Sequence, residues 1–423
     1  MSTLFFMKVF DSLKKQLGPG LMFAAASVGV SHLVQSTRSG ASFGLELVPL
    51  IILVCFLKYP TYQFSSTYAQ ATGSSLLYGY RDIGRWALIV WMGIAFFTMA
   101  IITAAVVLVT AGALNVLLGT HIAANNLAIL LMVPTVAILV IGGYNYLEKI
   151  VKILVLVFTF LTLFATANTL PNLNVEELNL FSLSAYSASN VFFLAALIGW
   201  MPNGTESSIL QSTWVAEKAR LNKGFKKSNM LFDLRLGYIG TVVLALAFVL
   251  MGASLMYSQG IQFEDSSVGF INQLVSLYSQ SVGSWSAPVI KLTVFIILYT
   301  TVIAVIDGYS RVMSDGVLII KEIPSQTTTS RYYYLFIGIN CIFGYLIIHY
   351  WVSSFTQMID SVTTLSFIIA PLIAILNMRA LYTGAISKID RPSQFMKYYG
   401  YTGIVFMSLF AISYLYIRFV YQG

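Results

Sequence analysis

Long apolar runs alternate with short polar segments from residue 18 almost to the end of the chain. An apolar run of about 18 or more residues forms an α-helix that can cross a hydrocarbon core about 30 Å thick. The pattern therefore predicts an all-α integral membrane protein, a single domain over 1–423 with eleven transmembrane helices. The predicted spans are 18–42, 46–70, 87–118, 123–143, 148–169, 189–213, 231–257, 287–314, 332–351, 358–381 and 399–420.

The first predicted span is interrupted near its middle. Residues 18–44 read GPGLMFAAASVGVSHLVQSTRSGASFG, which places His32 and the polar run from Gln35 to Arg38 at membrane depth. Backbone that leaves the helix is tolerated there only where it is buried in protein or lines a cavity. The interruption therefore indicates a binding site.

A second interruption, Met201-Pro202-Asn203-Gly204, lies in the sixth span. Pro202 lacks a backbone N–H and Gly204 permits non-helical φ angles, so upstream carbonyl oxygens lose their helical partners. Two broken helices in corresponding halves of a polytopic protein are typical of a transporter's substrate site. Their spacing fits two inverted five-helix repeats and one extra helix, at 18–169, 189–381 and 399–420.

Composition agrees with this topology. Of the 423 residues, 58% are hydrophobic and only 9% are charged, which is not the composition of a soluble domain. The N-terminal segment MSTLFFMKVFDSLKKQ has too short an apolar stretch, and no small-residue cleavage site, for a signal peptide. Cys55 and Cys341 lie in apolar spans and are interpreted as small buried hydrophobes.

The net charge of +8 reflects orientation in the membrane rather than binding to nucleic acid. With a cytoplasmic N-terminus, all but five of the 24 Lys and Arg residues lie in inner segments, and the long outer loops carry acids. This bias predicts a multi-pass protein of the plasma (inner) membrane with an extracytoplasmic C-terminus. The five exceptions are Arg38, Lys58, Lys291, Arg311 and Arg418, and the outer acids are Glu176, Glu177, Glu264 and Asp265.

Two side chains at the interruptions could bind a metal. An ionisable residue inside the membrane, such as His32, suggests function, because burying it in lipid is costly. Its imidazole could ligate a metal or couple to protons, or it could be a packing residue bonded to helix 6 backbone. The Met201 thioether would select softer transition metals, although a lone Met is more often core filler.

Charged residues near these interruptions suggest a cation site or gates. Glu206 is the only carboxylate in either broken span, and it could bind a cation or a proton, or pair with Arg38 or Lys58 as a gate. Asp307 and Arg311 are four residues apart, so they can pair on one helix face, either structurally or as a gate or proton relay. The remaining candidates are Asp360, expected near the outer interface, and Thr364, whose hydroxyl lies deeper.

Several motifs are absent from the sequence. It contains no P-loop, Rossmann fingerprint, His-x-x-x-His pair or Cys cluster, and no nucleophile–base arrangement. These absences favour a secondary transporter or channel over an enzyme, with no resident cofactor.

Several motifs resemble those of the Nramp divalent-metal transporters. The helix 1 opening GPG and ending SGASFG are similar to that family, as are the Met-Pro pair, the end of helix 3 and a proline in helix 10. The resemblance implies the leucine-transporter-like fold, in which helices 1 and 6 unwind around a central site. The matching segments are 18–20, 39–44, 201–202, 115–119 and Pro371.

The same resemblance implies an altered site. The family's metal-binding Asp-Pro-Gly-Asn falls on Gly29, Val30, Ser31 and His32, so the carboxylate is lost and a histidine replaces the asparagine. Met201 keeps the position of the family's metal-binding methionine. Two family histidines correspond to Asn203 and Ser208, the helix 3 acids fall at Thr103 and Val106, and the helix 10 glutamine falls near Thr364.

The leading hypothesis is a secondary transporter that moves a divalent transition metal, Mn²⁺ or Fe²⁺-like, inward by alternating access. His32, Met201 and Glu206 are the candidate metal ligands, with backbone carbonyls near Gly29 and Ile198. The full candidate substrate site is Gly29, Ser31, His32, Ile198, Met201, Asn203, Glu206 and Thr364, and the gating or proton-relay candidates are Arg38, Thr103, Asp307 and Arg311.

Two alternatives remain open at this point. One is a transporter of a small organic solute, an amino acid or an amine, which the missing helix 1 carboxylate supports. The other is a sensor that kept the transporter fold and lost transport. The expected partners are the lipid bilayer and a small cation or solute, and the sequence leaves the oligomeric state open, with a monomer as the default.

Overall fold

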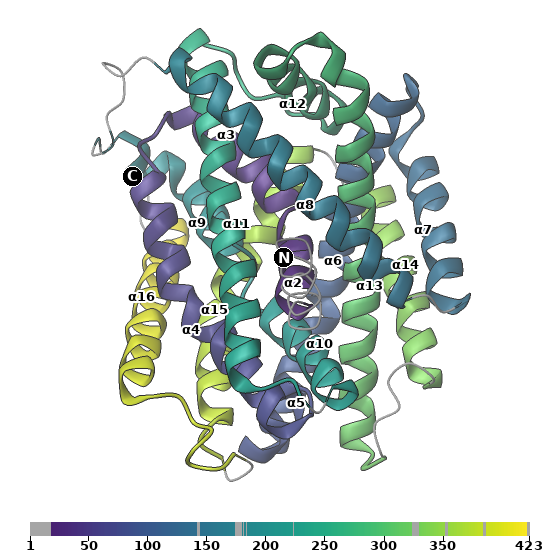
Figure 1. Cartoon of the computed structure of the whole chain (residues 1–423), viewed down its shortest axis with the longest axis vertical. Helices are drawn as coiled ribbons and strands as arrows, with labels where there is room; N and C mark the ends of the chain where they lie inside the picture. Colours follow the sequence, from purple (N-terminus) through teal and green to yellow (C-terminus); the bar gives the residue numbers. More distant parts are fainter. Residues whose placement is uncertain are drawn as a thin grey trace, which may run out of the picture.

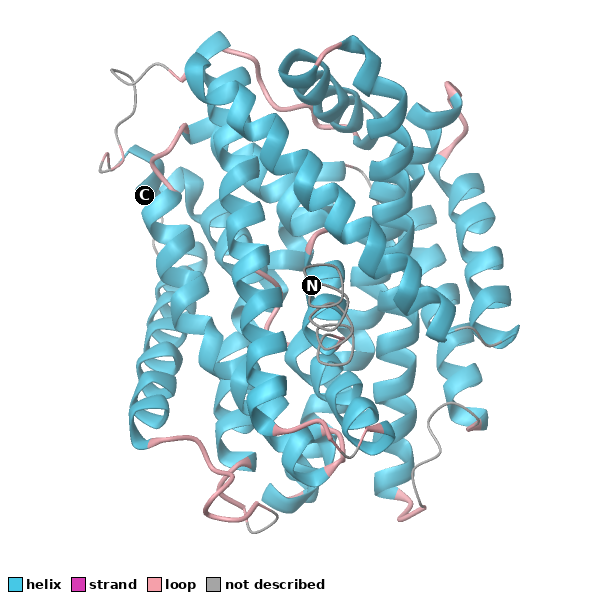
Figure 2. Cartoon of the chain, in the orientation of Figure 1, coloured by secondary structure: helices cyan, strands magenta, loops and turns pink. Residues whose placement is uncertain are grey.

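The computed structural model describes residues 18–141, 144–173, 180, 182, 184–222, 224–323, 330–351, 354–383 and 386–420. Across this part of the chain Figure 2 shows helices and loops and no strand. The segment considered for a signal peptide lies outside the described residues, as do six of the residues used for orientation. Those six are Lys8, Lys14, Lys15, Lys223, Glu176 and Glu177.

The elements follow one another as a helical bundle (Figure 1). The helices are α2 (Pro19–Ser27), the π-helix η1 (Ser31–Ser36), α3 (Thr37–Phe43), α4 (Val48–Thr72), α5 (Leu76–Ile83), α6 (Arg85–Leu118), α7 (Ala124–Ile141), α8 (Tyr144–Thr169), α9 (Val191–Trp200), α10 (Ser207–Leu221), α11 (Lys227–Leu255), α12 (Ser267–Val282), α13 (Ala287–Ile320), α14 (Arg331–Tyr350), α15 (Phe355–Ala380) and α16 (Gln394–Phe419). Short 3₁₀ turns are η2 (Leu170–Asn172), η4 (Ser184–Tyr186), η5 (Ala188–Asn190), η6 (Tyr257–Gln259) and η7 (Ser284–Ser286). We call α2, η1 and α3 together helix 1, and α9 with α10 helix 6.

Every predicted span overlaps a helix or a set of consecutive helices. In the described residues, 8 helices are long and apolar enough to cross a membrane, judged by length and composition. One further predicted span falls on α8, of which the apolar part described with its side chains is Leu156–Thr169, and two fall on helices 1 and 6, which are each divided into shorter helices. The all-α membrane fold is therefore confirmed, whereas the number of crossings and the division into two repeats remain predictions.

Two helices were missed because they are amphipathic rather than apolar throughout. Helices α5 and α12 lie at opposite ends of the bundle in Figure 1. In α12 the buried side chains Phe270, Leu274 and Tyr278 recur every four residues, so one face packs on the bundle while the other is polar. The Ser266 hydroxyl accepts a hydrogen bond from the backbone N–H of Gly269 and caps this helix.

Both broken helices pack closely against unbroken ones through glycine. A Cβ on Gly20 of α2 would lie 2.0 Å from the Asp233 carbonyl oxygen of α11. A Cβ on Gly199 of α9 would likewise lie 2.0 Å from the Thr363 carbonyl oxygen of α15. Small residues allow this approach of backbones in a membrane bundle, and here they hold the halves of helices 1 and 6 against α11 and α15.

Candidate functional site

Helix 1 is interrupted between Ser27 and Ser31, and its own serines satisfy the carbonyls near the break. The Ser27 hydroxyl donates to the Phe23 carbonyl at 2.7 Å, and the Ser31 hydroxyl donates to the Ser27 carbonyl at 2.6 Å. A Cβ on Gly29 would lie 3.2 Å from Thr301 of α13. The interruption therefore lies directly against α13.

His32 bridges this interruption to α11. It is fully buried, with Nδ1 2.7 Å from the Ser27 carbonyl oxygen and 2.8 Å from Ser31 Oγ. Its Nε2 lies 2.9 Å from the Thr241 carbonyl oxygen of α11. Whichever tautomer is present, both ring nitrogens face oxygen atoms of the protein, which is the arrangement of a packing residue.

Helix 6 is interrupted between Trp200 and Ser207, and most of the side chains that donate to its carbonyls come from α4, although the Ser207 hydroxyl donates to the Gly204 carbonyl at 2.7 Å. Pro202 has no N–H to donate to the Ile198 carbonyl. The fully buried Lys58 ammonium donates instead, at 2.6 Å to the Ile198 carbonyl, 2.7 Å to that of Gly199 and 3.3 Å to that of Asn203. The predicted free carbonyl at Ile198 is therefore occupied by a lysine of the same chain.

The phenol of Tyr62, one turn further along α4, forms hydrogen bonds with the next carbonyls, those of Asn203 and Gly204. Its hydroxyl lies 3.0 Å from the Asn203 carbonyl oxygen and 2.8 Å from that of Gly204, and donates toward both. The carbonyls of the break in helix 6 are thus bonded by one ammonium and one phenol from α4, together with the local hydroxyl of Ser207.

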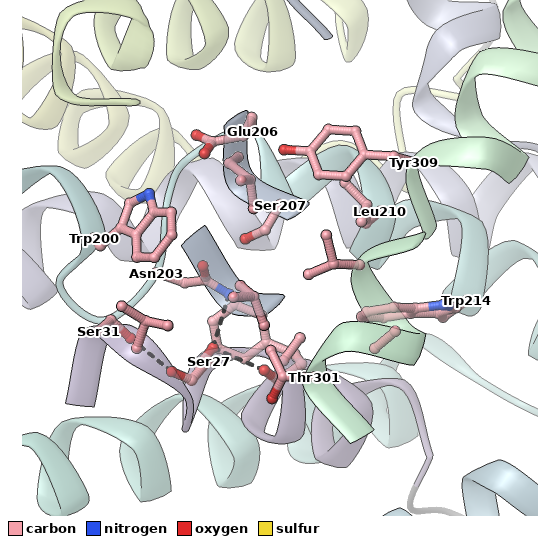
Figure 3. Close-up of a pocket in the computed structure, with 17 residues that line it drawn as sticks. Ser27, Ser31, Trp200, Asn203, Glu206, Ser207, Leu210, Trp214, Thr301 and Tyr309 are labelled. Atoms are coloured by element: carbon pink, nitrogen blue, oxygen red, sulfur yellow. Dashed lines mark hydrogen bonds between the residues drawn. The ribbon is translucent and has the colours of Figure 1, made fainter. Parts of the chain in front are cut away.

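A cavity of about 50 Å³ lies beside the two interruptions, between helix 1, α6, helix 6 and α13 (Figure 3). In Figure 3 the Tyr309 hydroxyl points from α13 toward the Glu206–Ser207 segment, and Trp200 and Trp214 stand on opposite sides. The polar lining residues are Ser27, Ser31, Asn203, Glu206, Ser207, Thr301 and Tyr309, with Trp200 and Trp214. The apolar ones are Phe23, Ala26, Val30, Ile102, Val106, Leu210, Ala304 and Val305.

Glu206 supplies the carboxylate of this lining, at 4% exposure. Its Oε1 accepts a hydrogen bond from Ser366 Oγ of α15 at 2.6 Å, and Ser366 Oγ in turn accepts one from Trp200 Nε1 at 2.8 Å. Its Oε2 is buried and has no hydrogen-bond partner among the described residues. A buried carboxylate oxygen left unpaired is costly, so this oxygen is positioned to receive a cation or a proton.

An ion pair joins helix 1 to α15 on the predicted outer side of the cavity. One nitrogen of Arg38 lies 2.9 and 2.8 Å from the two carboxylate oxygens of Asp360, and Gln35 Nε2 donates to the same carboxylate at 2.9 Å. Asp360 is 4% exposed, so it is buried within the protein, and its position near the outer membrane interface remains a prediction. The Arg38 guanidinium of α3 is thus paired with Asp360 of α15, a partner that was not visible in the sequence.

The start of helix 1 is fixed by a second carboxylate. The backbone N–H groups of Gly18 and Gly20 donate to the two oxygens of Asp233 at 3.0 and 2.8 Å. A carboxylate at a helix N-terminus satisfies donors without helical partners and complements the helix dipole. Helix 1 is thus tied to α15 at one end and to α11 at the other.

The predicted pairing of Asp307 with Arg311 is present. Arg311 Nε donates to Asp307 Oδ2 at 2.7 Å, and the Tyr333 hydroxyl of α14 donates to Oδ1 at 2.6 Å. Neither residue lines the cavity described above. Thr103 of α6 and Thr364 of α15 are buried, with hydroxyls that have no hydrogen-bond partner among the described residues, and they do not line it either. The gating and relay roles remain predictions.

The structure brings only part of the predicted site together. Ser31, Asn203 and Glu206 line the cavity, whereas His32 and Met201 do not. Met201 is fully buried in an apolar cluster, with its sulfur 3.7 Å from Ser36 Oγ. Gly29, Ile198 and Thr364 are also outside the lining. Among the described residues no three His, Cys, Asp or Glu side chains group as a metal site, so the three-ligand set stays a prediction that requires movement of helices 1 and 6.

Sequence reasoning missed several lining and supporting residues. Lys58 was considered only as a partner of Glu206, although a lysine in the middle of an apolar span is itself a signal of function. The hydroxyl and indole residues gave no such signal, because these types are common in membrane helices. They are Ser27, Tyr62, Trp200, Ser207, Trp214, Thr301, Tyr309 and Ser366.

A family model described as natural resistance-associated macrophage protein-like (Nramp) matches residues 20–417. The chain belongs to the Nramp family. Nramp proteins are transporters. The chain is also 30% identical over 371 residues to an uncharacterized protein of Pasteurella multocida, covering 87% of this chain and 85% of that protein.

Solved structures confirm the leucine-transporter-like fold for this Nramp chain. A manganese transporter of Eremococcus coleocola superposes with a TM-score of 0.70 at 14% identity, over 98% of this chain and 90% of the other. MhsT in complex with L-phenylalanine superposes with a TM-score of 0.63 at 13% identity, over 95% and 98% of the two chains. At these identities the likeness concerns the fold alone.

Proposed function

We propose that this Nramp chain is a secondary transporter that moves a divalent metal cation, Mn²⁺ foremost, into the cell by alternating access through an altered site. The observation that carries the proposal is the buried, unpartnered Oε2 of Glu206, which belongs to a residue lining the cavity beside both helix interruptions. The manganese transporter of Eremococcus coleocola, with the same fold, supports the choice of Mn²⁺.

The donors around the cavity favour an oxygen-preferring ion. They are one carboxylate, several hydroxyls and the Asn203 amide, with neither His32 nor Met201 in the lining. Carboxylates, carbonyls and water suit Mn²⁺, Mg²⁺ and Ca²⁺ better than softer metals. A water molecule needs roughly 10–15 Å³ of such space, so a cavity of about 50 Å³ admits an ion with a few waters.

Alternating access needs a barrier on each side of the substrate. The Arg38–Asp360 ion pair joins helix 1 to α15, and Asp233 of α11 caps the other end of helix 1. Breaking one connection while the other holds would open the cavity toward one side at a time. With the predicted cytoplasmic N-terminus, the Asp233 connection is the inner one.

Metal uptake into proteoliposomes tests the proposal. Purified wild-type protein should give saturable Mn²⁺ uptake, followed with an internal metal-quenched dye. Glu206→Gln keeps the size of the side chain and should lower uptake at least about tenfold, because it removes the anionic ligand. The matched control is Glu217→Gln, an exposed carboxylate later on the same helix, paired with Arg220.

Two results would contradict the proposal. One is a lack of uptake by correctly inserted wild-type protein across Mn²⁺, Mg²⁺ and Ca²⁺. The other is uptake by Glu206→Gln that equals that of Glu217→Gln.

A small organic solute is the second candidate substrate. The observation that favours it is the occupation of the Ile198 carbonyl by Lys58, which removes a ligand from any metal there. MhsT, with the same fold, binds L-phenylalanine. The small cavity volume argues against a solute of that size in the present conformation. Stabilisation of the folded protein by amino acids or amines, and not by Mn²⁺, would favour this candidate.

A further inference from the structure

The Lys58 ammonium is held in an unusual way for a buried charge. The side chain is fully buried, and its hydrogen-bond partners are the three backbone carbonyls of Ile198, Gly199 and Asn203. In the described part of the chain no carboxylate lies within 4.0 Å of the ammonium. Backbone carbonyls therefore make the direct contacts with this cation, and the Glu206 carboxylate attracts it only from beyond 4.0 Å.

The chemistry of the three carbonyls matches the cation that occupies them. An ammonium has three N–H donors and no acceptor, and three carbonyls receive them. Ile198 and Gly199 belong to the last turn of α9, whose C-terminal end carries partial negative charge. Unwound carbonyls and half-helix C-terminal ends are also the groups that coordinate small cations in transporters with broken helices.

We propose that the Ile198, Gly199 and Asn203 carbonyls form a monovalent-cation site that Lys58 occupies permanently as a tethered ammonium. Removing the tether leaves a site for a free alkylammonium, NH₄⁺ or K⁺ ion. Because Lys58 occupies the Ile198 carbonyl, this carbonyl cannot coordinate the transported ion. The substrate therefore binds in the cavity lined by Glu206 without this ligand. That last consequence rests on the proposed function, whereas the cation site does not.

Chemical rescue of Lys58→Ala tests the site. The substitution keeps Cβ and deletes the atoms from Cγ to Nζ, which correspond to n-propylammonium. The midpoint temperature of unfolding of the purified full chain in detergent would be measured against n-propylammonium, n-propanol and tetramethylammonium, at constant ionic strength. Lys58→Met is the matched control, because its side chain fills the stem of the site and leaves no room for the amine.

The expected result is a saturable rise of the midpoint for Lys58→Ala with n-propylammonium, with smaller rises for NH₄⁺ and K⁺. Wild type and Lys58→Met should show no such rise. Equal effects of n-propylammonium and n-propanol would overturn the proposal, since volume rather than charge would then explain binding. An absence of any shift specific to Lys58→Ala would also overturn it.

A Lys58→Ala variant that aggregates without additive still gives a decisive result. The yield of monodisperse protein purified throughout in n-propylammonium would be compared with the yield in n-propanol. A higher yield with the amine supports the site, and equal yields contradict it. Neither measurement uses transport, so failed Mn²⁺ uptake and a failed cation site are distinguished.

Discussion

Helix 1 after Ser27 and helix 6 after Trp200 both stop short inside the bundle, yet different parts of the protein stabilise the two interruptions. In helix 1 the donors come from Ser27 and Ser31 within the helix, and His32 links it to α11. In helix 6 they come mainly from α4, through a buried ammonium and a phenol, with Ser207 as one local donor. The first interruption depends mainly on local neutral hydrogen bonds, and the second on a distant charge.

The residues that stabilise the two interruptions are therefore different from the residue proposed to bind the substrate. Hydrogen bonds to charged groups contribute about 1.5–3 kcal/mol each, roughly twice the contribution of neutral ones. We therefore expect the loss of one side chain of α4 to lower the free energy of unfolding more than the loss of one donor in helix 1. The Glu206 carboxylate takes no part in stabilising either interruption and remains available to bind the substrate.

The largest expected effect is that of Lys58→Met. It removes the side-chain donor of the buried Ile198 and Gly199 carbonyls, while Tyr62 still donates to that of Asn203, and it should lower the free energy of unfolding by at least about 3 kcal/mol. SDS titration of the protein in mixed micelles measures this, with Lys291→Met, a half-buried lysine of α13, as control. Equal effects of the two substitutions would show that helix 6 does not depend on Lys58.

A smaller loss is expected for His32→Gln. The amide can replace only part of the imidazole's contacts with Ser27 and Thr241, so the free energy of unfolding should fall by about 1–3 kcal/mol. Because neither nitrogen faces the cavity, the concentration of Mn²⁺ at half-maximal uptake should stay within about twofold of wild type. A rise of tenfold or more, with the fold retained, would instead identify His32 as a ligand.

Asp233→Ala should cost about 1 kcal/mol, the usual effect of losing a helix N-cap. It should also loosen the inner end of helix 1 without disturbing Arg38 and Asp360. The measurement uses Ser27→Cys in a background that lacks Cys55 and Cys341. This cysteine should react faster with a water-soluble maleimide only when the reagent is added on the inner side. An equal rise from both sides would argue against two separate connections.

Met201→Leu should have the smallest effect, below about 1.5 kcal/mol, because the two side chains have similar volumes. The sulfur packs among apolar side chains, so the ratio of Mn²⁺ to Ca²⁺ uptake should be unchanged. Competition uptake in proteoliposomes measures this ratio. Lost discrimination against Ca²⁺ would place the Met201 sulfur at the ion during transport and restore the sulfur ligand that the sequence suggested.

Much of the fold could be predicted because the membrane requires it. Spans long enough to cross the bilayer must be apolar, and broken spans must line a cavity, so the positions of both interruptions were readable. The amphipathic α5 and α12 were not, since neither has an apolar run of spanning length. At the site, Ser31, Asn203 and Glu206 were predicted and line the cavity, whereas Lys58 and Ser366 act from helices elsewhere in the chain.

The sequence by itself determined that this is an all-α membrane protein, where helices 1 and 6 break, and that one carboxylate stands at the second break. Pro202 even identifies Ile198 as a carbonyl without a helical donor. Only the tertiary structure decided which side chain donates to this carbonyl. Lys58 lies 140 positions away in the sequence and reaches the carbonyl only after α4 packs beside helix 6. Donors and acceptors at a break are chosen by packing geometry, and the sequence carries no local record of that choice.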